Sequence, residues 1–177
     1  MQLWTIQRRG LIELAREQGV AAPTWRDVEA RWHEAFRWIL ALTPAVPDAS
    51  LAHAPPVWAW HSCGAWQSPP LAEDIDMLLG QAEDRLRSSL VVAELTVPDE
   101  RVLLSRYGPW NDMLEDLDRT GRLSPRAPAE LLDIEPLRGR SWRASGNRDD
   151  IQASFRGLRA EWIGDTSALG DWSALTW

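Results

Sequence analysis

The stretch PPVWAWHSCGAW, residues 55–66, places three tryptophans, one histidine and the chain's single cysteine within twelve positions. Imidazole and thiolate groups bind zinc, and a structural zinc site needs four such ligands. Beyond His61 and Cys63 the chain offers only His33 and His53, and no ligand spacing joins them. We therefore predict no metal site. A nucleophilic thiol at Cys63 with His61 or His33 as its base is a second interpretation, but a separation of two residues within a loop does not support it.

The two tryptophans of the VWAW segment allow two interpretations. The segment predicts a short strand, in which Trp58 and Trp60 share one face because side chains alternate along a strand. Two indoles on one face could form a stacking platform for a flat ligand. They could also pack into a hydrophobic core, and core packing is the favoured interpretation.

Three carboxylates lie close together in the segment LAEDIDMLLGQAED, at Glu73, Asp74 and Asp76. Paired carboxylates can bind Mg²⁺ or transfer protons. The segment is also typical of the first turn of a helix, where negative charge stabilises the helix dipole. The helix-dipole interpretation is favoured here.

An arginine-rich segment, LRGRSWRASGNR, contains Arg138, Arg140, Arg143 and Arg148 without any acid. Guanidinium groups suit phosphate, and the tryptophan within the segment suits a base or a nicotinamide ring. This is the best candidate in the sequence for an anion site. A solvated loop is the alternative.

The overall charge limits the classes of partner. The net charge is −7 and the pI about 5.0, which disfavours attraction to duplex DNA or to an anionic membrane. Between Arg119 and Arg159, however, nine arginines face five acids. One cysteine cannot form an intrachain disulfide, and the sequence shows no secretion signal and no membrane span. We therefore expect a cytoplasmic protein.

The elements that must position these residues follow from periodicity and from turn residues. Gly19 and Gly121 suit the ends of two helices, and Thr24 with Asp27 suits the start of another. Strands are expected at residues 2–6, 57–60, 89–97, 101–105, 150–158 and 161–169, and helices at 10–19, 24–42, 71–86, 108–121 and 129–134. Residues 43–56 and 61–70 are expected to be loops. This order predicts one α+β domain over residues 1–177, with a twisted, mostly antiparallel sheet flanked by helices.

Four motifs resemble a bacterial family described only as a domain of unknown function: LWTIQ, PVWAW, LTVPDERVLLSRYGPW and SW…IQASF. They extend from Leu3 to about Ile163 and occur in the same order. In the family a histidine follows the tryptophan that matches Trp110, whereas Asn111 stands here. The resemblance implies no established activity.

The opening LWTIQRRGLIELAREQGV and the late strand IQAS also resemble the ADP-ribosyltransferase superfamily, including its RNA 2′-phosphotransferase and DNA-modifying branches. Thr5 stands at the position of that superfamily's strand histidine. Gln152 matches the first residue of its Gln-x-Glu motif, and Ser154 replaces the catalytic glutamate. The resemblance implies NAD as cofactor and a transferase activity, for which Asp150 or Glu161 would have to replace the missing carboxylate.

Together these observations predict a cleft for NAD or another nucleotide-like ligand. Thr5 and Gln152 would bond a ribose or carboxamide, and an arginine of the basic segment would meet phosphate. The expected cleft residues are Trp4, Thr5, Trp58, Trp60, Tyr107 and Gln152, with Arg140, Arg143 or Arg148 on the phosphate. Two alternatives remain open. One is a non-enzymatic protein-binding module of a toxin–antitoxin or phage-defence system, with tryptophan anchors. The other is an RNA-end-processing protein that uses the basic segment.

Overall fold

The computed structural model describes residues 1–80, 84–123, 129–143 and 149–172. The helices are α1 (Arg9–Gln18), α2 (His33–Leu42), α3 (Ala49–Ala52), α4 (Ala72–Leu79), α5 (Asp84–Ser89), α6 (Tyr107–Thr120) and α7 (Leu169–Trp172). The strands are β1 (Gln2–Arg8), β2 (Val20–Ala21), β3 (Val57–Ser62), β4 (Leu90–Thr96), β5 (Leu103–Arg106), β6 (Ile151–Phe155), β7 (Leu158–Arg159) and β8 (Ile163–Ala168). Among these described residues, no helix combines the length and apolar character needed to span a membrane.

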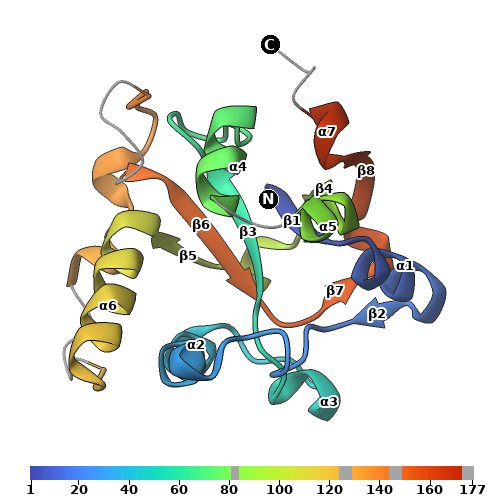
Figure 1. Ribbon diagram of the computed structural model, residues 1–177, viewed down its shortest axis with the longest axis horizontal. Coiled ribbons are helices and arrows are strands. Elements are labelled where there is room, and N and C mark those ends of the chain that lie inside the picture. Colours follow the sequence, from blue (N-terminus) through green and yellow to red (C-terminus); the bar gives the residue numbers. More distant parts are fainter. Residues whose placement is uncertain (81–83, 124–128, 144–148, 173–177) are drawn as a thin grey trace.

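Six strands form one sheet in the order β5-β6-β3-β1-β4-β8, and every neighbouring pair is antiparallel. Strands β2 and β7 form a separate antiparallel pair. Helices flank the large sheet (Figure 1). The predicted α+β class with a mostly antiparallel sheet is therefore confirmed.

The sheet separates two groups of apolar side chains because successive residues of a strand point to opposite faces. One face, here called the α1 face, carries Leu3, Ala93 and Phe155 and packs against Ile12 and Ala15 of α1. The other face, here called the groove face, carries Trp4, Trp58, Trp60 and Gln152. These four share a face because Trp4 is paired with Trp60, Trp60 with Gln152 and Trp58 with Ser154.

The groove face is covered by two groups of helices. Trp58 packs with α2 and α6, in a cluster that includes Ile39 and Trp110. Trp4 packs with α4 and α7 through Ile75 and Trp172. In Figure 1, α2 and α6 occupy the lower left, whereas α4 and α7 lie above. The two clusters are therefore distinct.

The local signals for helix ends are confirmed at two glycines. Gly19 follows α1 with φ of 83°, and Gly121 follows α6 with φ of 67°. Both values lie in the left-handed region that glycine enters without steric cost.

The predicted helix over residues 24–42 is wrong in its first part. Thr24 and Asp27 do bond to each other, but the chain then makes only a 3₁₀ turn at Ala30–Trp32 before α2 begins at His33. The Nε2–H group of His33 donates to the carbonyls of Trp25 and Val28, at 3.2 and 3.0 Å. Those are carbonyls that a continuous helix would use in its own ladder, so the imidazole stabilises a turn instead.

Three smaller expectations also need correction. The segment 71–86 is broken at Gly80, whose φ is 48°, so α4 ends at Leu79. The expected loop 43–56 contains α3, which Asp48 caps by accepting the backbone N–H of Ser50. Strand β3 continues through His61 and Ser62, which were expected in a loop.

Candidate functional site

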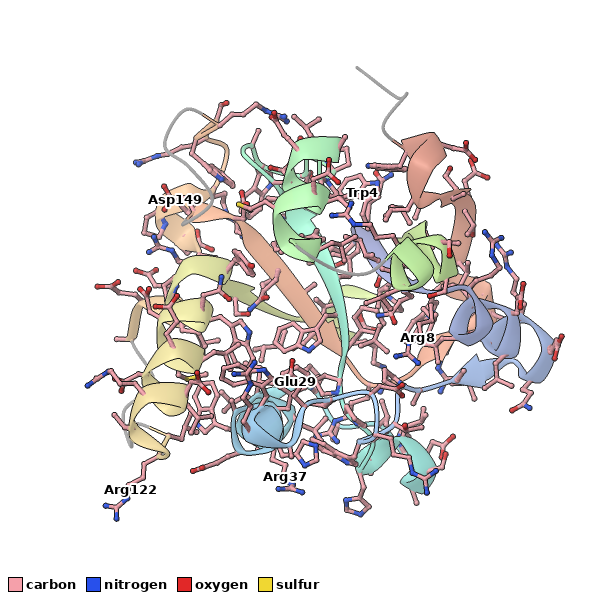
Figure 2. The ribbon with its side chains drawn as sticks, in the orientation of Figure 1. Trp4, Arg8, Glu29, Arg37, Arg122 and Asp149 are labelled. Atoms are coloured by element: carbon pink, nitrogen blue, oxygen red, sulfur yellow. The ribbon has the colours of Figure 1, made fainter. Side chains whose placement is uncertain are left out.

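A groove of about 1110 Å³ opens on the groove face of the sheet. Four separate segments line it: the end of β1 with the start of α1, residues 22–36, residues 55–58 and residues 88–90. Figure 2 shows Arg8 on the α1 side and Glu29 on the α2 side of this region. Most of its lining side chains are apolar, and the charged ones belong to residues 8–9 and 27–29.

One wall of the groove is aromatic and is formed by Trp32, Phe36 and Trp58. The Phe36 and Trp58 rings meet edge to face, with their centroids 5.6 Å apart. Behind them, the buried Trp110 lies 4.9 Å from Trp58 and 5.9 Å from Phe36. This packing holds Phe36 and Trp58 in place, and the Arg31 guanidinium lies over the Trp32 ring, 4.5 Å from its centroid. The partly exposed side of the wall offers a surface to a flat ligand.

The opposite side of the groove is the start of α1, which contains Arg8, Arg9 and Gly10. The N-cap residue Arg8 makes no side-chain cap, and the first turn contains no acid. The first backbone N–H groups of a helix lack intrahelical partners and form its positive end. We find no ion pair of Arg9 among the described residues. This end of the groove is therefore suited to an anionic group.

Arg8 already forms an ion pair with a carboxylate of the same chain. Its Nη1 lies 3.3 Å from Oδ1 of Asp27. The other carboxylate oxygen accepts the Thr24 N–H at 3.0 Å and the Thr24 hydroxyl at 2.8 Å. These bonds from Thr24, backbone first, lower the pKa of Asp27, and Arg8 adds to the effect. Glu29, also in the groove, pairs with Arg31 at 2.8 Å.

The structure does not bring Thr5 and Gln152 together. Thr5 follows Trp4 in β1 and therefore points to the α1 face, whereas Gln152 is on the groove face. The Thr5 hydroxyl donates to the carbonyl of Trp58 at 2.6 Å and is fully buried. Strand β3 also lies between the strands of these two residues. No single ligand can contact both side chains in this arrangement.

Most of the predicted indole platform lies in the interior. Trp4 is buried against Ile75 and Trp172, and Trp60 is buried with its ring 4.9 Å from Tyr107. Of the six predicted cleft residues, only Trp58 lines the groove. The amide nitrogen of the buried Gln152 has no partner in the described part of the chain.

The arginine-rich segment lies away from the groove. Arg143 lines a second cavity of about 220 Å³ and donates to the hydroxyl of Ser68 at 3.0 Å. Arg140 is exposed and does not line the groove, and Arg148 falls outside the described residues. Arg156, also within the locally basic region, donates to three backbone carbonyls at the ends of α2 and α3.

Within the segment PPVWAWHSCGAW, Cys63 and Gly64 line the second cavity, and His61 does not. Cys63 lines it and is 1% exposed, and burial raises the pKa of its thiol far above the ordinary value. His61 is also buried, which lowers its pKa to about 4, and its Nδ1 meets the Ser62 hydroxyl at 2.7 Å. A reactive cysteine needs a stabilised thiolate, so this arrangement does not form a nucleophilic pair. Among the described residues no cluster of three or more metal-ligand side chains occurs.

Asp150 lines the same cavity and anchors its loop. One oxygen, Oδ1, accepts the Gly64 N–H at 2.8 Å and the Trp142 indole N–H at 3.3 Å. Burial raises its pKa to about 6, more than these two hydrogen bonds lower it. Neither Asp150 nor the exposed Glu161 lines the groove. Neither is therefore placed to supply the missing carboxylate of a ligand bound there.

Sequence reasoning missed Arg8, Arg9, Asp27, Trp32 and Phe36 as a possible site. A signal was present in the Arg-Arg-Gly sequence at residues 8–10, between a strand and a helix. Trp32 and Phe36 both fall within the helix predicted over residues 24–42, but Trp32 ends a 3₁₀ turn and Phe36 lies in α2. Their exposure depends on the chain that packs around them, which periodicity does not report.

No protein-family model, no curated protein and no solved structure matches this chain. The resemblances seen in the sequence therefore stay predictions, and the geometry of the groove is what bears on function.

Proposed function

We propose that this protein binds a nucleotide-like ligand, with NAD among the candidates, in the groove between α1 and α2. One observation carries the proposal: an aromatic wall and an arginine-bearing helix start open into the same groove. A planar base or nicotinamide ring would stack on Trp32 and Trp58. A phosphate would meet Arg9 and the first N–H groups of α1.

General physical chemistry supports both the phosphate contact and the stacking contact. Helix starts and arginine forks are the usual partners of phosphate in proteins. Base stacking on an aromatic side chain contributes about 1–3 kcal/mol per base. Small-molecule sites usually enclose about 300–1,000 Å³, and the groove, at about 1110 Å³, is large enough for a dinucleotide.

ADP-ribosyl transfer is not part of the proposal. That reaction requires a carboxylate close to the nicotinamide ribose, and the groove's carboxylates, Asp27 and Glu29, are paired with Arg8 and Arg31. The superfamily resemblance also depended on Thr5 and Gln152, which are on opposite faces of the sheet. Binding without transfer is consistent with the geometry described above.

Isothermal titration calorimetry with NAD, AMP and adenosine tests the proposal. Trp32→Leu removes one stacking surface and should weaken binding of all three about tenfold. Trp66→Leu is the matched control, because Trp66 is also partly exposed but packs on His61 outside the groove. Absence of binding by the wild-type protein at millimolar ligand contradicts the proposal, as does equal weakening by both variants.

A partner-protein segment is the second candidate occupant. Leu14 at the margin of the groove is 38% exposed, and it extends the apolar lining onto the outer side of α1. An apolar side chain of a partner would be buried there at about 25 cal/mol per Å². Leu14→Ser should then abolish partner binding while leaving nucleotide affinity unchanged, and a pull-down compared with the calorimetry separates the two occupants.

A further inference from the structure

In the ion pair between Arg8 and Asp27, which both line the groove, one side chain is held more firmly than the other. Asp27 is held by Thr24 through two bonds to its carboxylate, and the Asp27 N–H donates to the Thr24 carbonyl at 2.9 Å. Arg8 makes one contact to Asp27, at 3.3 Å, and its side chain is 62% exposed. The guanidinium can therefore leave the carboxylate, while the carboxylate stays in position.

We propose that Asp27 is an internal counter-ion that competes with the phosphate of a bound ligand for Arg8, and so sets the charge preference of the groove. The inference rests on the proposed function and adds a specificity-determining residue to it. Asp27 has two effects on an anion. It holds Arg8 in an ion pair, and its own negative charge stays at the mouth after Arg8 has turned to the ligand.

The first effect applies to any anion that takes Arg8, and the second increases with the charge of the ligand. Glu29 is offset by Arg31 at 2.8 Å. Among the described residues, the one ion pair of Asp27 is with Arg8, the group that the ligand would engage. The affinity for a neutral nucleoside does not depend on the charge of Asp27. Asp27 repels a monophosphate weakly and a triphosphate most strongly, because Coulomb repulsion grows with the charge of the ligand. The charge of Asp27 should therefore weaken the binding of a triphosphate more than that of a monophosphate, relative to a groove that lacks this charge.

Asp27→Asn isolates the charge. The asparagine carbonyl can still accept the two bonds from Thr24, so the turn is retained, and only the negative charge near Arg8 is removed. Relative to the wild-type protein, we expect no change in affinity for adenosine, a gain of about twofold for AMP and a gain of about tenfold for ATP at low salt. High salt should reduce these gains, since exposed charges are screened.

The matched control is Asp48→Asn. Asp48 accepts the same pair of local bonds, from the N–H and hydroxyl of Ser50, but it does not line the groove. Its substitution should leave all three affinities unchanged. Arg8→Gln provides a second, independent variant, in which the affinity for AMP should fall while that for adenosine stays unchanged. The preference for AMP over adenosine should therefore decrease, and Arg9 with the first N–H groups of α1 retains the rest of it.

Calorimetric titration of adenosine, AMP and ATP into the wild-type protein and the three variants tests the role of Asp27. If adenosine binds and Asp27→Asn gives the same change for every ligand, the counter-ion role is wrong while the proposed function stands. An unchanged AMP-to-adenosine ratio in Arg8→Gln also overturns the inference, even if Asp27→Asn does not fold. If none of the ligands binds to the wild-type protein, the proposed function itself is wrong.

Discussion

The carboxyl group of Asp150 makes the stability of this protein depend on pH in an unusual direction. It is 4% exposed, and burial raises its pKa from 3.8 to about 6. The folded chain therefore binds this proton more tightly than the unfolded chain. Raising the pH from 4 to 6 ionises the group in the unfolded state first, so the folded state loses stability in that interval. Below pH 3.8 the carboxyl is protonated in both states, so it does not change the free energy of unfolding.

The size of the effect follows from the separation of the two pKa values. About two pH units at 1.4 kcal/mol each give an upper bound of about 3 kcal/mol at neutral pH. Asp150→Asn keeps an oxygen that can accept the Gly64 N–H and the Trp142 indole N–H, but it carries no charge. The variant should match the wild-type protein near pH 4 and exceed its stability by about 1–3 kcal/mol at pH 7.

Urea denaturation of both proteins at a series of pH values measures this difference. The wild-type curve alone is not informative, because His61 acts in the opposite direction. Burial lowers the pKa of His61 to about 4, so its contribution to stability is lost as the pH falls from about 6.5 towards 4. Subtracting the two curves removes His61 and every other group that titrates equally in both proteins.

A flat difference between the two curves would refute the reasoning, because it would mean that Asp150 has the same pKa in the folded and unfolded chains. A loss of stability in Asp150→Asn at every pH would also refute it. That result would show that a charged acceptor stabilises the Gly64 loop more than its burial costs.

Two further predictions concern the interior. Arg156→Met should lower the free energy of unfolding by about 2–4 kcal/mol, because it leaves three backbone carbonyls at the ends of α2 and α3 without their charged donor. Arg101→Met, which removes a single exposed bond to the carbonyl of Ala45, should change it by less than about 1 kcal/mol, and equal losses in urea denaturation would contradict the assignment. The Cys63 thiol, 1% exposed and with a raised pKa, should react with a disulfide reagent at least about a hundredfold more slowly in the folded than in the urea-unfolded protein. Comparable rates in the two states would show that the cavity beside Asp150 exposes the sulfur.

Much of the secondary structure could be predicted from local signals. The alternation of Leu3, Trp4 and Thr5, the β-branched run before Pro98 and the glycines at 19 and 121 all indicate structures that the fold contains. These signals succeed because strand alternation and a left-handed glycine are properties of a few adjacent residues. The predicted helix start at Thr24 was wrong although the contacts there are also local. The His33 imidazole bonds to the carbonyls of Trp25 and Val28, which a continuous helix would use in its own ladder.

The candidate site depended on the tertiary structure. The sequence by itself determined which residues alternate in β1, and therefore that Trp4 and Thr5 point in opposite directions. Only the pairing register of β1, β3 and β6 decided which face Gln152 shares, and this placed it opposite to Thr5. The packing of helices on that face then buried Trp4 and Trp60. The groove likewise forms because the tertiary structure brings residues 6–14, 22–36, 55–58 and 88–90 together. Strand register is determined by the burial of whole sheet faces, which joins residues far apart in the sequence. The free energy of that burial cannot be read from any single segment.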